Sequence, residues 1–81
     1  MRHAGDTALD TLEDLLAELR CMPGLVEKKR GIFYRRARAF LHFHEDPAGI
    51  FADLRLADAW QRLPVNTLAE RKALREMMNE K

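Results

Sequence analysis

Residues 38–56, RAFLHFHEDPAGIFADLRL, read as two strands joined by a tight turn. Apolar and polar side chains alternate on both sides of Asp46–Gly49, which is typical of half-buried β-strands. Asp, Pro and Gly at the first, second and fourth places of that segment favour a type I turn. A four-residue turn there sets Glu45 opposite Ile50, and the remaining cross-strand pairs follow because directly paired residues share a face. We therefore expect an antiparallel hairpin with strands at 38–45 and 50–56.

A further strand is expected just before this hairpin, over Gly31–Arg35, where apolar and aromatic residues dominate. A two-residue loop at Arg36–Ala37 would pair Arg35 with Arg38 and Phe33 with Phe40. Because Arg-Ala is not a favoured two-residue hairpin turn, a longer loop stays open as an alternative.

Helical patterns flank the expected strands. A capping box formed by Thr67 and Glu70 opens the C-terminal helix. A short helical turn is expected over 58–61, stopped by Pro64, which cannot continue a helix. The N-terminal helix ends at Pro23-Gly24, and its apolar stripe contains Leu9, Leu12, Leu16 and Leu19.

These elements predict a single small α+β domain over residues 6–81, preceded by a flexible N-terminus at residues 1–5. The expected order is a helix, a three-stranded antiparallel β-meander, a short turn and a second helix. With 81 residues the chain has room for one domain only. The helices are expected to cover the face of the sheet that carries Ile32, Tyr34, Leu41, Phe43, Ile50, Leu54 and Leu56.

The opposite face of the expected sheet has an unusual composition for a solvated surface. The register places aromatic, imidazole and charged side chains on it, a mixture that is usually covered by a helix, a partner or a ligand. Our first functional expectation is therefore a non-enzymatic interaction module that forms a homodimer, or binds another protein, through this face. The residues expected at this interface or ligand face are Phe33, Phe40, Phe51, Arg35, Arg38 and Arg55.

A metal site on the same face is the alternative. His42 and His44 are separated by one residue and therefore point to the same side of a strand, about 7 Å apart. The register sets Asp53 opposite His42, so two imidazoles and one carboxylate could hold a divalent metal such as zinc or ferrous iron. A hydrogen-bonded or ionic pair of His and Asp is the competing interpretation. No catalytic residue is assigned, because the chain has no Ser and Cys21 lies at a helix C-terminus, where the dipole disfavours a thiolate.

Nucleic-acid binding is a third hypothesis. Residues 27–38 carry six basic side chains against one acid, although the whole chain has a formal net charge of only +1. Arg35, Arg38 and Arg55 beside aromatic rings could stack single-stranded bases, but Asp53 and the flanking acids disfavour a phosphate path. Lysines and arginines that block edge-to-edge aggregation are the simpler reading of this basic segment.

The composition restricts the classes of protein to which this chain can belong. No apolar run approaches the length of a membrane span, and the first residues lack the apolar core of a signal peptide. The single cysteine excludes an internal disulfide. The chain is therefore expected to be cytoplasmic, without a membrane partner.

Part of the chain resembles a known family. The stretch 40–56, followed by Trp60 and Pro64-Val65 and preceded by the Pro23–Glu27 segment, is similar to the small bacterial "luciferase domain" proteins over about residues 22–65. His42 and His44 match the His-x-His pair of that family. Further family histidines, one of them before the late proline, are replaced here by apolar residues such as Leu63. The layout also loosely resembles MmcQ/YjbR-like proteins, which implies a partner-binding or DNA-binding module.

Overall fold

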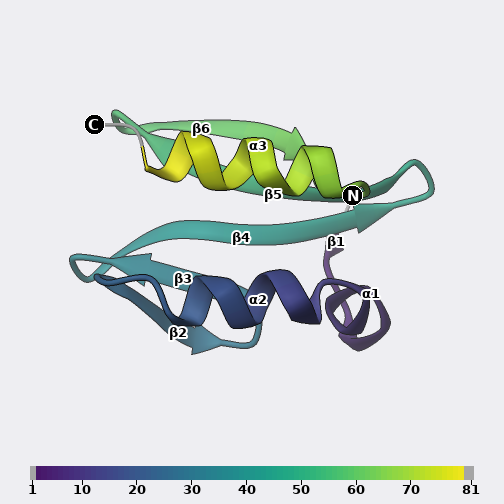
Figure 1. The fold of residues 1–81 in the computed structure, drawn as a ribbon, viewed down its shortest axis with the longest axis horizontal. Coiled ribbons are helices and arrows are strands. Elements are labelled where there is room, and N and C mark those ends of the chain that lie inside the picture. Colours follow the sequence, from purple (N-terminus) through teal and green to yellow (C-terminus); the bar gives the residue numbers. More distant parts are fainter. Residues whose placement is uncertain (1, 80–81) are drawn as a thin grey trace.

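Six strands and three helices make up residues 2–79, the part of the chain that this computed structural model describes (Figure 1). The order of the elements is β1 Arg2–His3, α1 Asp6–Thr11, α2 Glu13–Arg20, β2 Leu25–Lys29, β3 Ile32–Arg35, β4 Arg38–Asp46, β5 Gly49–Leu56, β6 Ala59–Pro64 and α3 Leu68–Met78.

The strands form one antiparallel sheet in the order β2-β3-β4-β5-β6. β1 pairs with the end of β4 that β3 does not reach. The expected three-stranded meander is therefore wrong, because residues 2–79 contribute six strands to the sheet. β2 and β6 lie at the two edges of the sheet and are mostly exposed. Edge strands often carry charged residues that prevent aggregation, and this weakens their sequence signal.

Tight turns connect the central strands. The predicted hairpin between β4 and β5 is confirmed, with Glu45 opposite Ile50 and Asp46 opposite Gly49. The two-residue loop at Arg36–Ala37 is also confirmed, and both of its residues have positive φ angles, 53° and 65°. Ala57–Asp58 forms a second such loop, with φ angles of 51° and 64°, where a helical turn was expected. Positive φ at both loop residues is the geometry of type I′ hairpins, which suits the twist of the flanking strands.

A β-bulge changes the predicted register between β3 and β4. Phe33 lies opposite Leu41 instead of Phe40, and Ile32 lies opposite His42, because the pairing shifts by one residue between Phe33 and Tyr34. The extra residue of a bulge turns neighbouring side chains onto the other face. The placement of Phe33 and Phe40 on the open face is therefore wrong: both belong to the buried core, with exposed fractions of 0% and 7%. Ile32 leaves the core face for the same reason.

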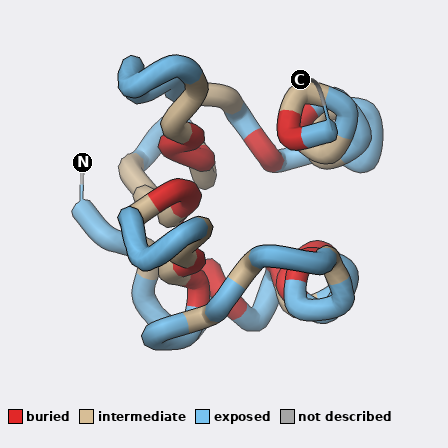
Figure 2. Tube along the Cα trace, turned by 90° about the vertical axis from the view of Figure 1, so that its left-hand side faces the viewer, coloured by how far each residue is buried: buried red, intermediate tan, exposed pale blue. Residues whose placement is uncertain are grey.

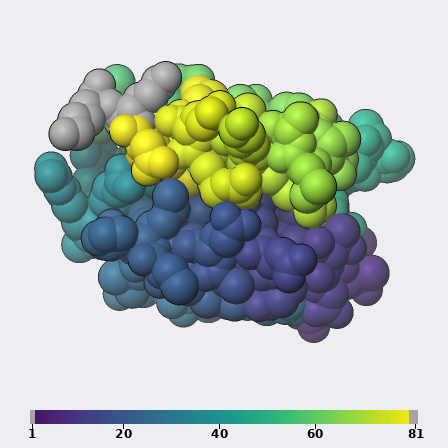
Figure 3. All heavy atoms as spheres, viewed as in Figure 1, coloured from purple at the N-terminus to yellow at the C-terminus, as the bar shows by residue number. Residues whose placement is uncertain are grey.

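The helices lie together on one side of the sheet (Figure 2). From that side, α2 and α3 lie next to each other over the strands (Figure 3), and Arg75 of α3 lies 3.5 Å from Glu18 of α2. The predicted capping box is confirmed, since Thr67 and Glu70 exchange hydrogen bonds at the start of α3. The expected N-terminal helix is divided into α1 and α2 at Leu12. The buried apolar cluster between helices and sheet contains Leu12, Leu15, Leu16, Leu19, Phe33, Leu41, Phe43, Ala52, Leu54, Val65, Leu74 and Met78.

This arrangement leaves the opposite face of the sheet without a helix on it in residues 2–79 (Figures 1 and 2). Three strands bring polar and aromatic residues to this region: β4 carries His42 and His44, β5 carries Asp53, and β6 carries Trp60. None of the helices in residues 2–79 combines the length and the hydropathy that crossing a membrane requires.

Candidate functional site

The centre of the uncovered face of the sheet is a pair of imidazoles on β4. His42 and His44 project to the same side because one residue separates them on the strand. Their rings meet edge to face, with centroids 4.8 Å apart. The side chains keep 20% and 14% of their exposure, so the rings are largely shielded from water but still reachable.

A third imidazole reaches this pair from the start of the chain. His3 of β1 pairs with His44, and its ring centroid lies 4.7 Å from that of His44 and 5.7 Å from that of His42. The ligand atoms of the three histidines all lie within 4.8 Å of one another. We call His3, His42 and His44 the histidine cluster. Sequence reasoning assigned no role to His3, because nothing around it in the chain predicts pairing with a strand some 40 residues later.

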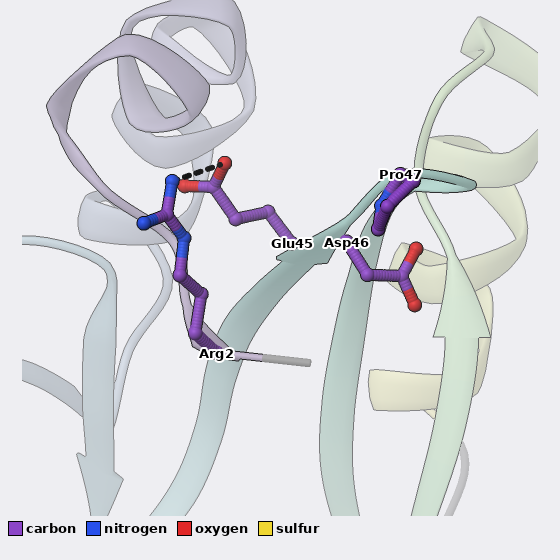
Figure 4. Close-up of a pocket in the computed structure, with 4 residues that line it drawn as sticks. All are labelled: Arg2, Glu45, Asp46 and Pro47. Carbon is purple, nitrogen blue, oxygen red and sulfur yellow. Dashed lines mark hydrogen bonds and ion pairs between the residues drawn. The ribbon is translucent and has the colours of Figure 1, made fainter.

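Several contacts hold β1 in place beside β4. The backbone N–H of Ala4 donates to the carbonyl of Phe43 at 3.0 Å. The N–H of Gly5 donates to Glu45 Oε2 at 2.6 Å, and Arg2 Nη2 lies 3.5 Å from Glu45 Oε1 (Figure 4). The hydrogen bond from the N–H of Gly5 lowers the pKa of Glu45, and the carboxylate is charged at neutral pH. His3 is thus anchored through its neighbours on both sides.

The carboxylate of Asp53 lies beneath the cluster. The predicted pairing of His42 with Asp53 is confirmed. Asp53 Oδ2 lies 2.8 Å from Nδ1 of His44 and 3.9 Å from Nδ1 of His42. Arg62 of β6 binds both oxygens, with Nε 2.8 Å from Oδ1 and Nη2 3.0 Å from Oδ2. This bidentate pair lowers the pKa of Asp53 and leaves the carboxylate better suited to orient an imidazole than to bind a metal directly.

Two imidazole nitrogens in the cluster lack hydrogen bonds. Nδ1 of His42 and Nδ1 of His44 are both shielded from solvent, and neither has a hydrogen-bond partner within residues 2–79. Nδ1 of His44 nevertheless lies 2.8 Å from Oδ2 of Asp53, whereas Nδ1 of His42 is 3.9 Å from the same oxygen. A buried polar group left without a partner costs about 1–3 kcal/mol. Asp53 already lies beside Nδ1 of His44, so Nδ1 of His42 is the buried nitrogen that a cation could satisfy.

The protonation state of His42 suits a metal. Burial lowers the pKa of His42, and the neighbouring His44 lowers it further. His42 is therefore neutral at pH 7, which is the form that coordinates metal ions. Ligand nitrogens of a tetrahedral zinc ion lie about 3.3 Å from one another, given Zn–N bonds of about 2.0–2.1 Å. Starting from separations of up to 4.8 Å, a modest inward movement of the imidazoles would close them around one ion.

The other residues predicted for this face fall into separate groups. Phe51 stays opposite His44 on β5. Arg35, Arg38 and Arg55 come together around a second recess, at the end of the sheet where the Arg36–Ala37 and Ala57–Asp58 loops lie. The structure thus separates the predicted face into a histidine cluster, a group of arginines and two phenylalanines that belong to the core.

Trp60, which sequence reasoning left without a role at this site, stands between the histidine cluster and the arginines. Its ring centroid lies 4.8 Å from that of His42, and the guanidinium carbon of Arg55 lies 4.7 Å from the same indole. The side chain is placed there by β6, which the sequence did not predict. Trp60 as a whole residue is 44% exposed.

A larger recess of about 500 Å³ lies beside the β4–β5 turn and is lined by Arg2, Glu45, Asp46 and Pro47 (Figure 4). Its charged groups are already engaged: Arg2 contacts Glu45, and Asp46 Oδ1 accepts the N–H of Ala48 at 2.7 Å. The recess offers no group comparable to the unpartnered imidazoles.

No family model, no curated protein and no solved structure matches this chain. The resemblance to the "luciferase domain" proteins and the looser resemblance to MmcQ/YjbR-like proteins therefore stay predictions.

Proposed function

We propose that this protein binds a divalent transition-metal ion, in the first place Zn²⁺, through His3, His42 and His44. The observation that carries the proposal is the convergence of three imidazoles with ligand atoms within 4.8 Å of one another; one of them, His42, has a buried Nδ1 atom without a hydrogen-bond partner in the described part of the chain. Imidazole nitrogen is a preferred zinc ligand, and three histidines are a known ligand set for zinc.

Asp53 acts as the orienting carboxylate in this proposal. It lies 2.8 Å from Nδ1 of His44 and is itself fixed by Arg62. Carboxylates placed behind a histidine ligand set the orientation of its ring and raise its basicity. The sequence-based ligand set of His42, His44 and Asp53 is therefore revised, with His3 in the place of the carboxylate.

The proposed centre has an accessible side. His3 is exposed, and no helix of residues 2–79 covers this face of the sheet. A zinc ion held by three histidines keeps a fourth position for water or a ligand, and it can lower the pKa of a bound water molecule or polarise a carbonyl group. The structure supports metal binding with ligand access.

Isothermal titration of the metal-stripped protein with Zn²⁺ tests the proposal. We expect one equivalent to bind with a Kd of about 1 µM or below. His42→Ala and His44→Ala should each weaken binding by about 100-fold or more, since each removes one of three ligands. Cys21→Ser is the control, because it removes the exposed thiol, the other group in the chain with high zinc affinity.

The proposal is wrong if the stripped protein takes up no zinc under these conditions. It is also wrong if the two histidine variants bind zinc as tightly as the wild type, or if Cys21→Ser abolishes binding while the histidine variants keep it. Circular dichroism of each variant establishes that it is folded before the titrations are compared.

Self-association through the open face of the sheet is a second candidate. Trp60 is a large side chain with 44% exposure on this face, and Phe51 is only partly buried. The loss of Phe33 and Phe40 to the core reduces the apolar area that a partner could cover. Light scattering with and without a chelator distinguishes the candidates: a dimer that persists with the chelator favours self-association, and a monomer contradicts it.

A further inference from the structure

The arginine-lined recess lies at the end of the sheet where two hairpin loops meet. Its volume is about 380 Å³, within the range of small-molecule sites. Arg38, which follows the first loop, contacts Asp58 of the second at 3.2 Å, so an ion pair ties the two loops together. We call this recess the arginine pocket; its lining is Arg35, Arg36, Arg38, Ala39, Phe40, Arg55, Ala57 and Asp58.

The charge of the arginine pocket is strongly unbalanced. Four arginines face one aspartate, for a net charge of +3, and Asp58 is already paired with Arg38. Arg35, Arg36 and Arg55 form no ion pair with any residue between 2 and 79. Arg20, by contrast, forms ion pairs with Glu13 and Glu27, which balance its charge. Uncompensated like charges repel one another, and a bound anion would remove that cost.

Two of these arginines are held in place by aromatic rings. The guanidinium of Arg35 lies 4.1 Å from the ring centroid of Phe40, and that of Arg55 lies 4.7 Å from the ring centroid of Trp60. Such stacking restricts the side chain while leaving the N–H groups at its edge free to donate. Nε of Arg55 is buried and has no hydrogen-bond partner in the described structure. An oxyanion in the pocket would bind the N–H groups at the outer edge of the two guanidiniums.

We propose that the arginine pocket binds the phosphate or diphosphate group of a small-molecule ligand. Arginine forks match phosphate oxygens in a bidentate manner, and a diphosphate carries enough negative charge to balance a net charge of +3. The recess has room for a ligand larger than the anion itself. This site is separate from the histidine cluster and does not depend on metal binding there.

Trp60 provides a direct readout, because it is the single tryptophan of the chain and stacks with Arg55. Pyrophosphate is titrated into the protein at low salt with a chelator present, and the tryptophan fluorescence is recorded. We expect a saturable change. Arg55→Gln should weaken binding by about 10- to 100-fold, since charge-assisted hydrogen bonds are lost. Arg36→Gln, at an exposed loop position, tests the same pocket if the Arg55 variant fails to fold.

Lys72→Gln is the matched control. It removes one positive charge from an exposed position on α3, and Lys72 does not line the arginine pocket. The affinity for pyrophosphate should then change by no more than about twofold. The proposal is overturned if pyrophosphate gives no saturable change up to about 10 mM, or if Lys72→Gln weakens binding as much as the pocket variants. Tighter binding of a single-stranded oligonucleotide than of pyrophosphate would also overturn it, in favour of nucleic acid.

Discussion

His3 is the residue whose replacement tests the histidine cluster most sharply, because only the tertiary structure brings it to the site. Four-ligand zinc sites bind with apparent free energies of about 10–16 kcal/mol at pH 7, which is about 3 kcal/mol for each ligand. We therefore expect His3→Ala to weaken zinc binding by about 100-fold. The backbone contacts that anchor β1, through Ala4 and Gly5, do not involve the imidazole and should survive.

The loss of zinc affinity can be measured through the midpoint of thermal unfolding, Tm. At a free zinc concentration 100 times the wild-type Kd, binding stabilises the native state by about 2.7 kcal/mol. A change of 1 kcal/mol moves the Tm of a domain of this size by about 4–8 °C, so zinc should raise the wild-type Tm by about 10–20 °C. At the same zinc concentration His3→Ala is only half saturated, and its Tm should rise by about 2–3 °C.

The assay is unfolding followed by circular dichroism in zinc-buffered solution. Arg2→Ala is the matched control, because it alters the neighbouring residue of β1 and removes an ion pair whose arginine side chain is 81% exposed. Such exposed pairs contribute little, so this variant should keep the full zinc response. A zinc-induced shift in His3→Ala equal to that of the wild type would refute the role of His3. The absence of a shift in the wild type would refute the metal centre as a whole.

Three further predictions concern the fold. Phe33→Ala should lower the free energy of unfolding by about 3–5 kcal/mol, because Phe33 is fully buried. Ile32→Ala, on the open face, should lower it by only about 1 kcal/mol. Equal effects of the two substitutions in urea unfolding would contradict the bulge. The hydrogen bond from Arg20 lowers the pKa of Glu27, so Glu27→Gln should cost about 1–2 kcal/mol at pH 7. Because the pKa of Glu27 is lower in the folded than in the unfolded state, this difference is complete above pH 4.5 and is lost as pH falls through the lowered pKa of the folded protein; a difference that does not change with pH would contradict this. Thr67→Ala should cost about 1 kcal/mol through loss of the capping box, and an unchanged Tm would contradict the cap.

Local patterns predicted the central hairpin and the C-terminal helix correctly. The alternation along residues 38–56 and the turn at Asp46–Gly49 set the register of β4 and β5, including His42 opposite Asp53. Side chains alternate between the two faces of a strand and the turn length is fixed, so only one register places the apolar residues on the same face. The capping box at Thr67 located the start of α3 in the same way. These features depend on neighbours in the chain, so the sequence alone was enough.

The edge strands and the bulge could not be predicted from local patterns. β2 and β6 pair on one side only and expose most of their residues, so their composition resembles that of loops. The bulge between β3 and β4 moved Phe33 into the core, although simple alternation from the Arg36–Ala37 loop placed it on the open face. One extra residue in a strand is invisible in the periodicity, because its position depends on packing against the helices.

The site itself was half predicted. The spacing of His42 and His44 and the hairpin register placed two imidazoles beside Asp53, since both follow from strand geometry. Three further facts depended on contacts between segments distant in the chain: β1 brings His3 to the pair, Arg62 from β6 engages Asp53, and two loops gather the arginine pocket. Pairing between distant segments is decided by which edges and faces remain free once the core is packed, and only the tertiary structure contains that information.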